Sequence, residues 1–126
     1  MKRRWFADMQ AKSRNLPPHA HAALTENLLA MSTDAYRRIY EEAVDYQVPA
    51  ALGLVRNPTL ITAGSREAKI IIQAVSAISN IMPNAQGYLA PERGHGWNVE
   101  APDLFNEMIR AWINGRPLPK GLQKIC

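Results

Sequence analysis

The sequence has a single cysteine, Cys126, which is its last residue. This excludes an internal disulfide, which needs two cysteines, and any metal site built from four cysteines. Long apolar runs are also lacking: the charged start MKRRWFADMQ is interrupted by Asp8, and no stretch approaches the length that spans a bilayer. These absences favour a soluble, cytoplasmic protein.

Positive charge gathers near the two ends of the sequence and does not form a continuous stripe. Five basic residues face one acid in residues 1–14, and the segment after Asn114 has three basic residues and no acid. Aromatic residues are not interleaved with these charges, as they are on many surfaces that bind nucleic acid. The sequence therefore predicts no nucleic-acid partner and no membrane partner.

What the chain does have is 47% apolar residues in a length of 126, the size of one globular domain. Its pattern changes at LGLVRNP. Before this point the chain shows short amphipathic helices, the first of them stopped by the prolines of NLPPH. After it, strands and helices alternate. We therefore expect a helical segment over residues 1–55, an α/β segment over 56–116 and a basic tail over 117–126.

The segment from 56 to 116 is typical of a β-α-β-α unit. A continuous apolar run over residues 59–63, stopped by Gly64, predicts a short strand buried on both faces. An amphipathic helix is expected over Glu67–Ile81, followed by a second short strand, AQGYLA. Strand, helix and strand occupy about thirty residues, the size of one right-handed crossover between parallel strands.

The last predicted helix begins near Pro102 and ends before Gly115. Proline suits the first turn of a helix, and Glu100 and Asp103 lie where the helix dipole favours anions. One apolar stripe consists of Leu104, Phe105, Met108, Ile109, Trp112 and Ile113. We expect this stripe to lie on the sheet.

A lone histidine, His95, follows the second predicted strand, and Glu67 follows the first. The carboxyl ends of parallel strands meet at one edge of a sheet, where α/β proteins gather their sites, so we expect these two side chains to lie close together. A histidine bonded to a carboxylate has one ring nitrogen fixed as a donor and the other free to act as a general base. Glu100 is the second candidate for the carboxylate that pairs with His95.

Two stretches of the chain, PTLITAGSRE and GHGWNVEAPDLFNEMIRAWI, resemble the last two strands, the histidine loop and the closing helix of the α/β-hydrolase superfamily. The resemblance covers about residues 56–114. It implies a partial α/β-hydrolase fold in which the preceding helices belong to the cap or lid. It also implies that His95 is the base of the catalytic triad and Glu67 its acid, at a position where the family more often has Asp.

The nucleophile of that family, a serine on a G-x-S-x-G turn, has no counterpart in this sequence. The earlier strands and the amides of the oxyanion hole are also unaccounted for. The resemblance thus implies the carboxyl-terminal half of a hydrolase of ester-like substrates, supplying base and acid but no nucleophile. We expect the chain alone to be inactive and to need an amino-terminal half.

Other interpretations of the same residues stay open. The chain is alternatively a non-catalytic interaction module that completes its sheet by forming a homodimer or docking on a partner, because two paired strands alone are marginally stable. Trp97 lies either in a substrate pocket or in the packing of the loop. His19 and His21 do not share a helix face and lack a third ligand, so the sequence predicts neither a metal nor a cofactor.

Overall fold

A computed structural model describes residues 2–13 and 16–125 of the chain. The chain divides into two compact units, Met1–Val48 and Pro49–Cys126, which we describe one at a time. This division falls a few residues before the change of pattern expected at residue 55. None of the helices in the described ranges is both long and apolar enough to cross a membrane.

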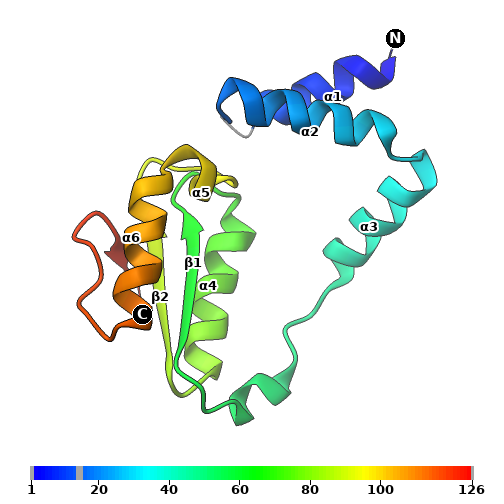
Figure 1. The fold of residues 1–126 in the computed structure, drawn as a ribbon. Helices are drawn as coiled ribbons and strands as arrows, with labels where there is room; N and C mark the ends of the chain where they lie inside the picture. Colours follow the sequence, from blue (N-terminus) through cyan, green and yellow to red (C-terminus); the bar gives the residue numbers. More distant parts are fainter. Residues whose placement is uncertain (1, 14–15, 126) are drawn as a thin grey trace. The chain divides into compact units, whose positions relative to one another are not determined.

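The described part of the first unit is helical (Figure 1). Its helices are α1 (Lys2–Ser13), α2 (Pro18–Ala30) and α3 (Thr33–Asp45). Pro18 occupies the first turn of α2, where its missing N–H leaves no helical bond unmade. The Ser32 hydroxyl caps α3 by accepting a hydrogen bond from the Ala35 N–H at 3.1 Å. The prolines and the capping serine therefore set the boundaries between these short helices.

The second unit has the predicted α/β fold. Its elements are η1 (Ala50–Leu54, a 3₁₀ helix), β1 (Thr59–Gly64), α4 (Lys69–Ile81), β2 (Ala85–Ala90), α5 (Trp97–Glu100), α6 (Pro102–Ile113) and β3 (Gln123–Lys124). The strands β1 and β2 are parallel, with Thr59 opposite Ala85 and Gly64 opposite Ala90. The predicted strand–helix–strand unit with parallel strands is therefore confirmed, and the two strands end at the same level.

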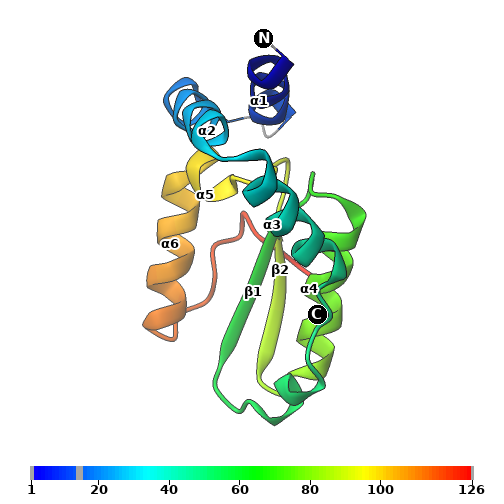
Figure 2. The ribbon, with the colours of Figure 1, turned by 90° about the vertical axis from the view of Figure 1, so that its right-hand side faces the viewer.

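Helices cover both faces of the sheet, α4 on one side and α6 on the other (Figure 2). Successive side chains of a strand point to opposite faces, so each strand contributes to two hydrophobic clusters. On the α4 side, Ala63 and Leu89 pack with Val75. On the α6 side, Ala90 packs with Met108. This double burial explains why the strand residues form continuous apolar runs.

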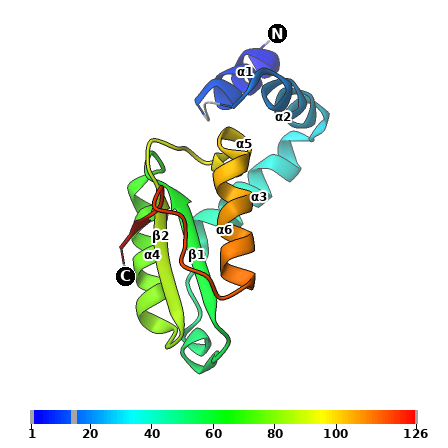
Figure 3. The ribbon, with the colours of Figure 1, turned by 60° about the vertical axis from the view of Figure 1, so that its left-hand side comes forward.

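A third strand, β3, was not expected from the sequence. It pairs antiparallel with β2, with Tyr88 opposite Lys124 and Leu89 opposite Gln123 (Figure 3). Leu122, just before β3, is 9% exposed and belongs to the cluster on the α6 side. The segment 117–126, which we expected to be a basic tail, thus includes residues that complete the second unit. Two polar strand residues are too few to show an alternating pattern.

The apolar stripe of α6 only partly faces the sheet. Met108 is 2% exposed, and Leu104 and Phe105 pack around it. Ile109 and Ile113, in contrast, are 37% and 75% exposed. At about 100° per residue these two side chains lie on the flank of the helix, beyond the reach of a narrow sheet. The expectation that the stripe lies on the sheet therefore holds for Leu104, Phe105 and Met108 but not for Ile109 and Ile113.

The hydroxyl of Ser79 in α4 is enclosed where this helix packs closely on the sheet. A Cβ atom at Gly87 of β2 would lie 2.7 Å from the Ser79 hydroxyl, which is buried and has no hydrogen-bond partner. A buried hydroxyl without a partner costs free energy, so Ser79→Ala should raise the free energy of unfolding. Ser76→Ala, in the same helix, measures the gain from helix propensity alone, about 0.5 kcal/mol. We expect Ser79→Ala to exceed it by about 0.5–1 kcal/mol in urea unfolding; an equal or smaller gain contradicts this.

Candidate functional site

The turns that follow β1 and β2 are bonded to each other through their backbones. The Ser65 N–H donates to the Ala90 carbonyl at 2.9 Å, and the Arg66 N–H donates to the Arg93 carbonyl at 2.8 Å. These bonds continue the contact between the two parallel strands beyond their last paired residues. The side chains that follow the two strands are therefore brought to one edge of the sheet, as expected for the carboxyl ends of parallel strands.

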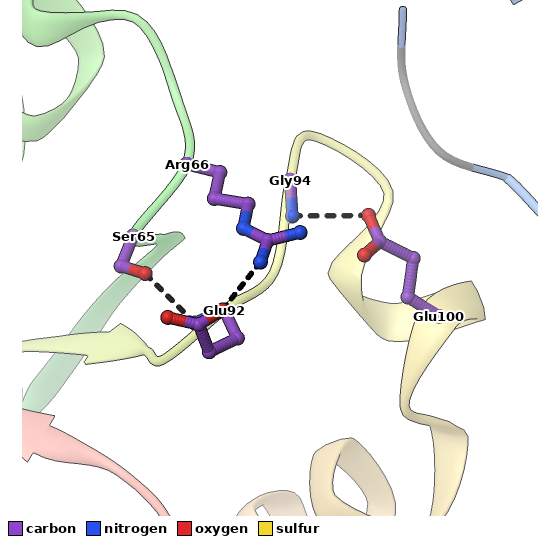
Figure 4. Close-up of polar contacts among 5 residues, drawn as sticks. All are labelled: Ser65, Arg66, Glu92, Gly94 and Glu100. Carbon is purple, nitrogen blue, oxygen red and sulfur yellow. Dashed lines mark hydrogen bonds and ion pairs between the residues drawn. The ribbon is translucent and has the colours of Figure 1, made fainter. Parts of the chain in front are cut away.

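Side chains add to this connection between the turns (Figure 4). The Ser65 hydroxyl accepts a hydrogen bond from the Glu92 N–H at 2.9 Å. The Arg66 guanidinium forms an ion pair with the Glu92 carboxylate. Glu92 has φ of 61°, a left-handed backbone that is uncommon for residues other than glycine. Both of its bonds to residues 65–66 hold this conformation, although an ion pair this exposed adds little stability, about 0–1 kcal/mol.

Gly64, the last residue of β1, allows the two turns to approach. A Cβ atom at this position would lie 2.3 Å from the carbonyl oxygens of both Arg93 and Gly94. No side chain fits in such a space, so the backbone of residues 93–94 crosses directly over Gly64. A glycine is thus required at this point by close approach.

His95 and Glu67 are in direct contact. The His95 Nδ1 lies 2.7 Å from the Glu67 Oε1. The Glu67 side chain is 12% exposed, whereas the His95 side chain is 63% exposed. The expectation that these two side chains lie next to each other is confirmed. A neutral imidazole in this position donates its Nδ1–H to the carboxylate and leaves Nε2 as the acceptor.

Glu100 has another contact. Its Oε1 accepts a hydrogen bond from the Gly94 N–H at 3.0 Å, so its carboxylate holds the backbone next to His95 (Figure 4). The sequence left open whether Glu67 or Glu100 pairs with His95, and the structure pairs it with Glu67. The contacts around Glu92 were not expected, although polar residues directly after strand ends are the signal that points to them.

Trp97 is packed inside the second unit. Its side chain is 5% exposed, and its ring meets that of Phe105 edge-on, with centroids 4.9 Å apart. The sequence allowed Trp97 either a place in a substrate pocket or a packing role. The structure shows a packing contact. Among residues 2–13 and 16–125 no group of three or more His, Cys, Asp or Glu side chains is arranged to hold a metal ion.

No family model matches the sequence. Two curated proteins do, both named "Putative carbamate hydrolase RutD". The protein from Caulobacter sp. (strain K31) is 26% identical over 84 residues, which is 67% of this chain and 31% of the relative. The protein from Pseudomonas syringae pv. syringae (strain B728a) is 31% identical over 98 residues, which is 78% of this chain and 35% of the relative. The chain spans about a third of the length of these relatives.

Among solved structures, MenH from S. aureus, an α/β-hydrolase, has a similar fold. The TM-score is 0.61 and the identity 22%, over 90% of this chain and 52% of that one. The parallel strands, the histidine turn and these likenesses together define a partial α/β-hydrolase fold. The chain is a relative of the α/β-hydrolase superfamily over part of the length of its members, as its histidine motif predicted.

The close approach at Gly64 leads to a first prediction for the site. Gly64→Ala should lower the free energy of unfolding by about 1–3 kcal/mol, because the new methyl group forces the backbone of residues 93–94 away. Gly53→Ala is the matched control, since a Cβ there has its nearest neighbour at 3.6 Å, an ordinary contact. Urea unfolding of both variants measures the difference. Equal stability of the two variants would show that the turns do not cross at Gly64.

The contact with Glu67 predicts which nitrogen of His95 carries the proton. At a pH where the imidazole is neutral, ¹⁵N NMR should find the proton on Nδ1, and Glu67→Leu should shift it toward Nε2, because the carboxylate acceptor is gone. His19 and His21 of α2 give internal controls in the same spectrum. An unchanged His95 tautomer in Glu67→Leu would contradict the contact.

Proposed function

We propose that this chain provides the histidine and the carboxylate of an α/β-hydrolase active site that cleaves ester-like bonds. His95 acts as the general base, and Glu67 fixes its orientation. The observation that carries the proposal is the 2.7 Å contact between the two side chains at the carboxyl edge of parallel strands. Kinship with proteins named as hydrolases supports the same reaction class.

The exposure of the two side chains suits these roles. Glu67, 12% exposed, is held within the turn after β1, whereas the His95 side chain, 63% exposed, leaves its second nitrogen open to a substrate. A carboxylate that accepts the Nδ1–H stabilises the imidazolium that forms when Nε2 takes up a proton. The pair can therefore take a proton from a nucleophile and return it to a leaving group.

The proposal assigns the nucleophile to a serine outside these 126 residues, since none of the serines here has a glycine two residues to each side. In the reaction, His95 Nε2 accepts the proton of that serine as its oxygen bonds to the substrate carbonyl carbon. His95 then gives the proton to the leaving group as the bond to that carbon breaks, and water removes the acyl group by the same steps.

Esters and carbamates are the substrate classes that we propose. Both have a carbonyl carbon joined to a leaving oxygen or nitrogen, and the two curated relatives are named for carbamate hydrolysis. The interaction module, the alternative from the sequence, is not favoured by these relatives.

A chimaera tests the proposal. The matching segment of the Pseudomonas syringae relative is replaced by this chain, and hydrolysis of p-nitrophenyl acetate and of an aryl carbamate is measured. We expect turnover, and we expect His95→Ala to lower kcat by about a thousandfold or more, because loss of a triad member removes proton transfer. Glu67→Gln should lower kcat by about a hundredfold or more, because a neutral amide no longer stabilises the imidazolium that forms at His95.

His19→Ala, in α2, is the matched control and should leave kcat within about twofold, because an exposed histidine outside the second unit takes no part in the proposed proton transfer. Turnover that survives His95→Ala would show that the base is another residue. A folded chimaera without turnover on either substrate would also count against the proposal.

A further inference from the structure

Each residue from Glu92 to His95 has a polar contact with a residue outside this run, through its backbone or, for His95, through its side chain. Three of these residues contact the turn 65–67 that follows β1. Gly94 instead points its N–H to Glu100 of α5, as Figure 4 shows. The other pairs are Glu92 with Ser65, Arg93 with Arg66, and His95 with Glu67. Glu100 thus makes the contact that ties this run to the helix that follows it.

The carboxylate of Glu100 is held at a cost. Its Oε1 accepts the Gly94 N–H at 3.0 Å, and its Oε2 is enclosed and has no hydrogen-bond partner. An enclosed carboxylate oxygen without a partner loses its hydration and gains nothing in return. A carboxylate can interact favourably with the amino-terminal end of α6 without being enclosed, as the exposed Asp103 in its first turn does. The interaction with this helix end therefore does not explain why Glu100 is enclosed.

The position of Glu100 is set by the core. Glu100 ends α5, and Trp97 begins it with a side chain that is 5% exposed and packed against Phe105. A four-residue helix with one buried tryptophan has little freedom to move relative to α6. The carboxylate therefore presents a fixed acceptor to Gly94, a residue whose backbone has more freedom than any other.

We propose that Glu100 is a positioning residue for His95. By fixing the peptide N–H of Gly94, it sets the direction in which the next residue extends and brings the imidazole Nδ1 to the Glu67 carboxylate. This inference rests on the proposed function, since it gives that site a third residue, which acts on the histidine through the backbone and does not touch the substrate.

The experiment uses the ¹⁵N-labelled 126-residue chain and two readouts, amide hydrogen exchange at Gly94 and the tautomer of His95. Glu100→Ala should speed exchange at Gly94 by about ten- to hundredfold, the size expected for a lost bond to a charged acceptor. The same variant should move the His95 proton from Nδ1 toward Nε2. Glu100→Gln should leave the Gly94 exchange rate and the His95 tautomer unchanged, because its side-chain carbonyl accepts the same N–H.

Asp103→Ala is the matched control, since it removes a carboxylate from the start of α6 with no effect expected at Gly94 or His95. If Glu100→Ala unfolds the chain, Glu100→Asp replaces it. This variant keeps the charge but is one methylene shorter, so exchange at Gly94 should again be faster and the His95 proton should again move toward Nε2. A purely structural role predicts a lower melting temperature with an unchanged His95 tautomer, and that result would overturn the inference.

Failure of Glu100→Gln to preserve the tautomer would also overturn it, because the charge and not the bond would then be decisive. These measurements require no turnover. Survival of chimaera turnover in His95→Ala refutes the catalytic proposal, whereas the tautomer result judges Glu100 alone.

Discussion

The parallel pairing of β1 and β2, in which Gly64 lies opposite Ala90, is the constraint on which the rest of the site depends. It ends both strands at the same level, so the chain leaves the sheet twice at one place. The absence of a side chain at Gly64 then lets the backbone of residues 93–94 pass over the first strand. Without this approach, an imidazole and a carboxylate 28 positions apart in the sequence would not be within hydrogen-bonding distance.

Apolar packing and polar contacts contribute to the site in different ways. Apolar packing, with Trp97 and Met108 on one face and Val75 on the other, supplies the stability through burial. The polar contacts of the turns are mostly exposed, and exposed polar pairs contribute little to stability. Their effect is geometric: they select one arrangement of a turn that includes the left-handed Glu92. Trp97 belongs to both groups, because its burial stabilises the core and also sets where Glu100 lies.

The sequence predicted the parts of the molecule that are set by periodicity and by short-range signals. The strands β1 and β2 and the helix α6 were predicted within a few residues, because apolar runs, Pro102 and Gly115 mark them directly. The strand β3 was missed because its pairing depends on tertiary contact and not on local pattern. The contact between His95 and Glu67 followed from topology, whereas the Glu100 contact with Gly94 depends on where Trp97 packs, which no spacing rule predicts.

The position of β3 makes the sheet asymmetric. In the described residues the strand order is β1-β2-β3, so β2 has neighbours on both sides and β1 on one. Of the two edge strands, β1 has six residues and β3 two, so β1 offers the longer open edge to an added strand, on the side of Glu67. With a neighbour there, β1 would change from an edge strand to an interior one, as β2 already is. The turns that carry Glu67 and His95 would then both follow interior strands.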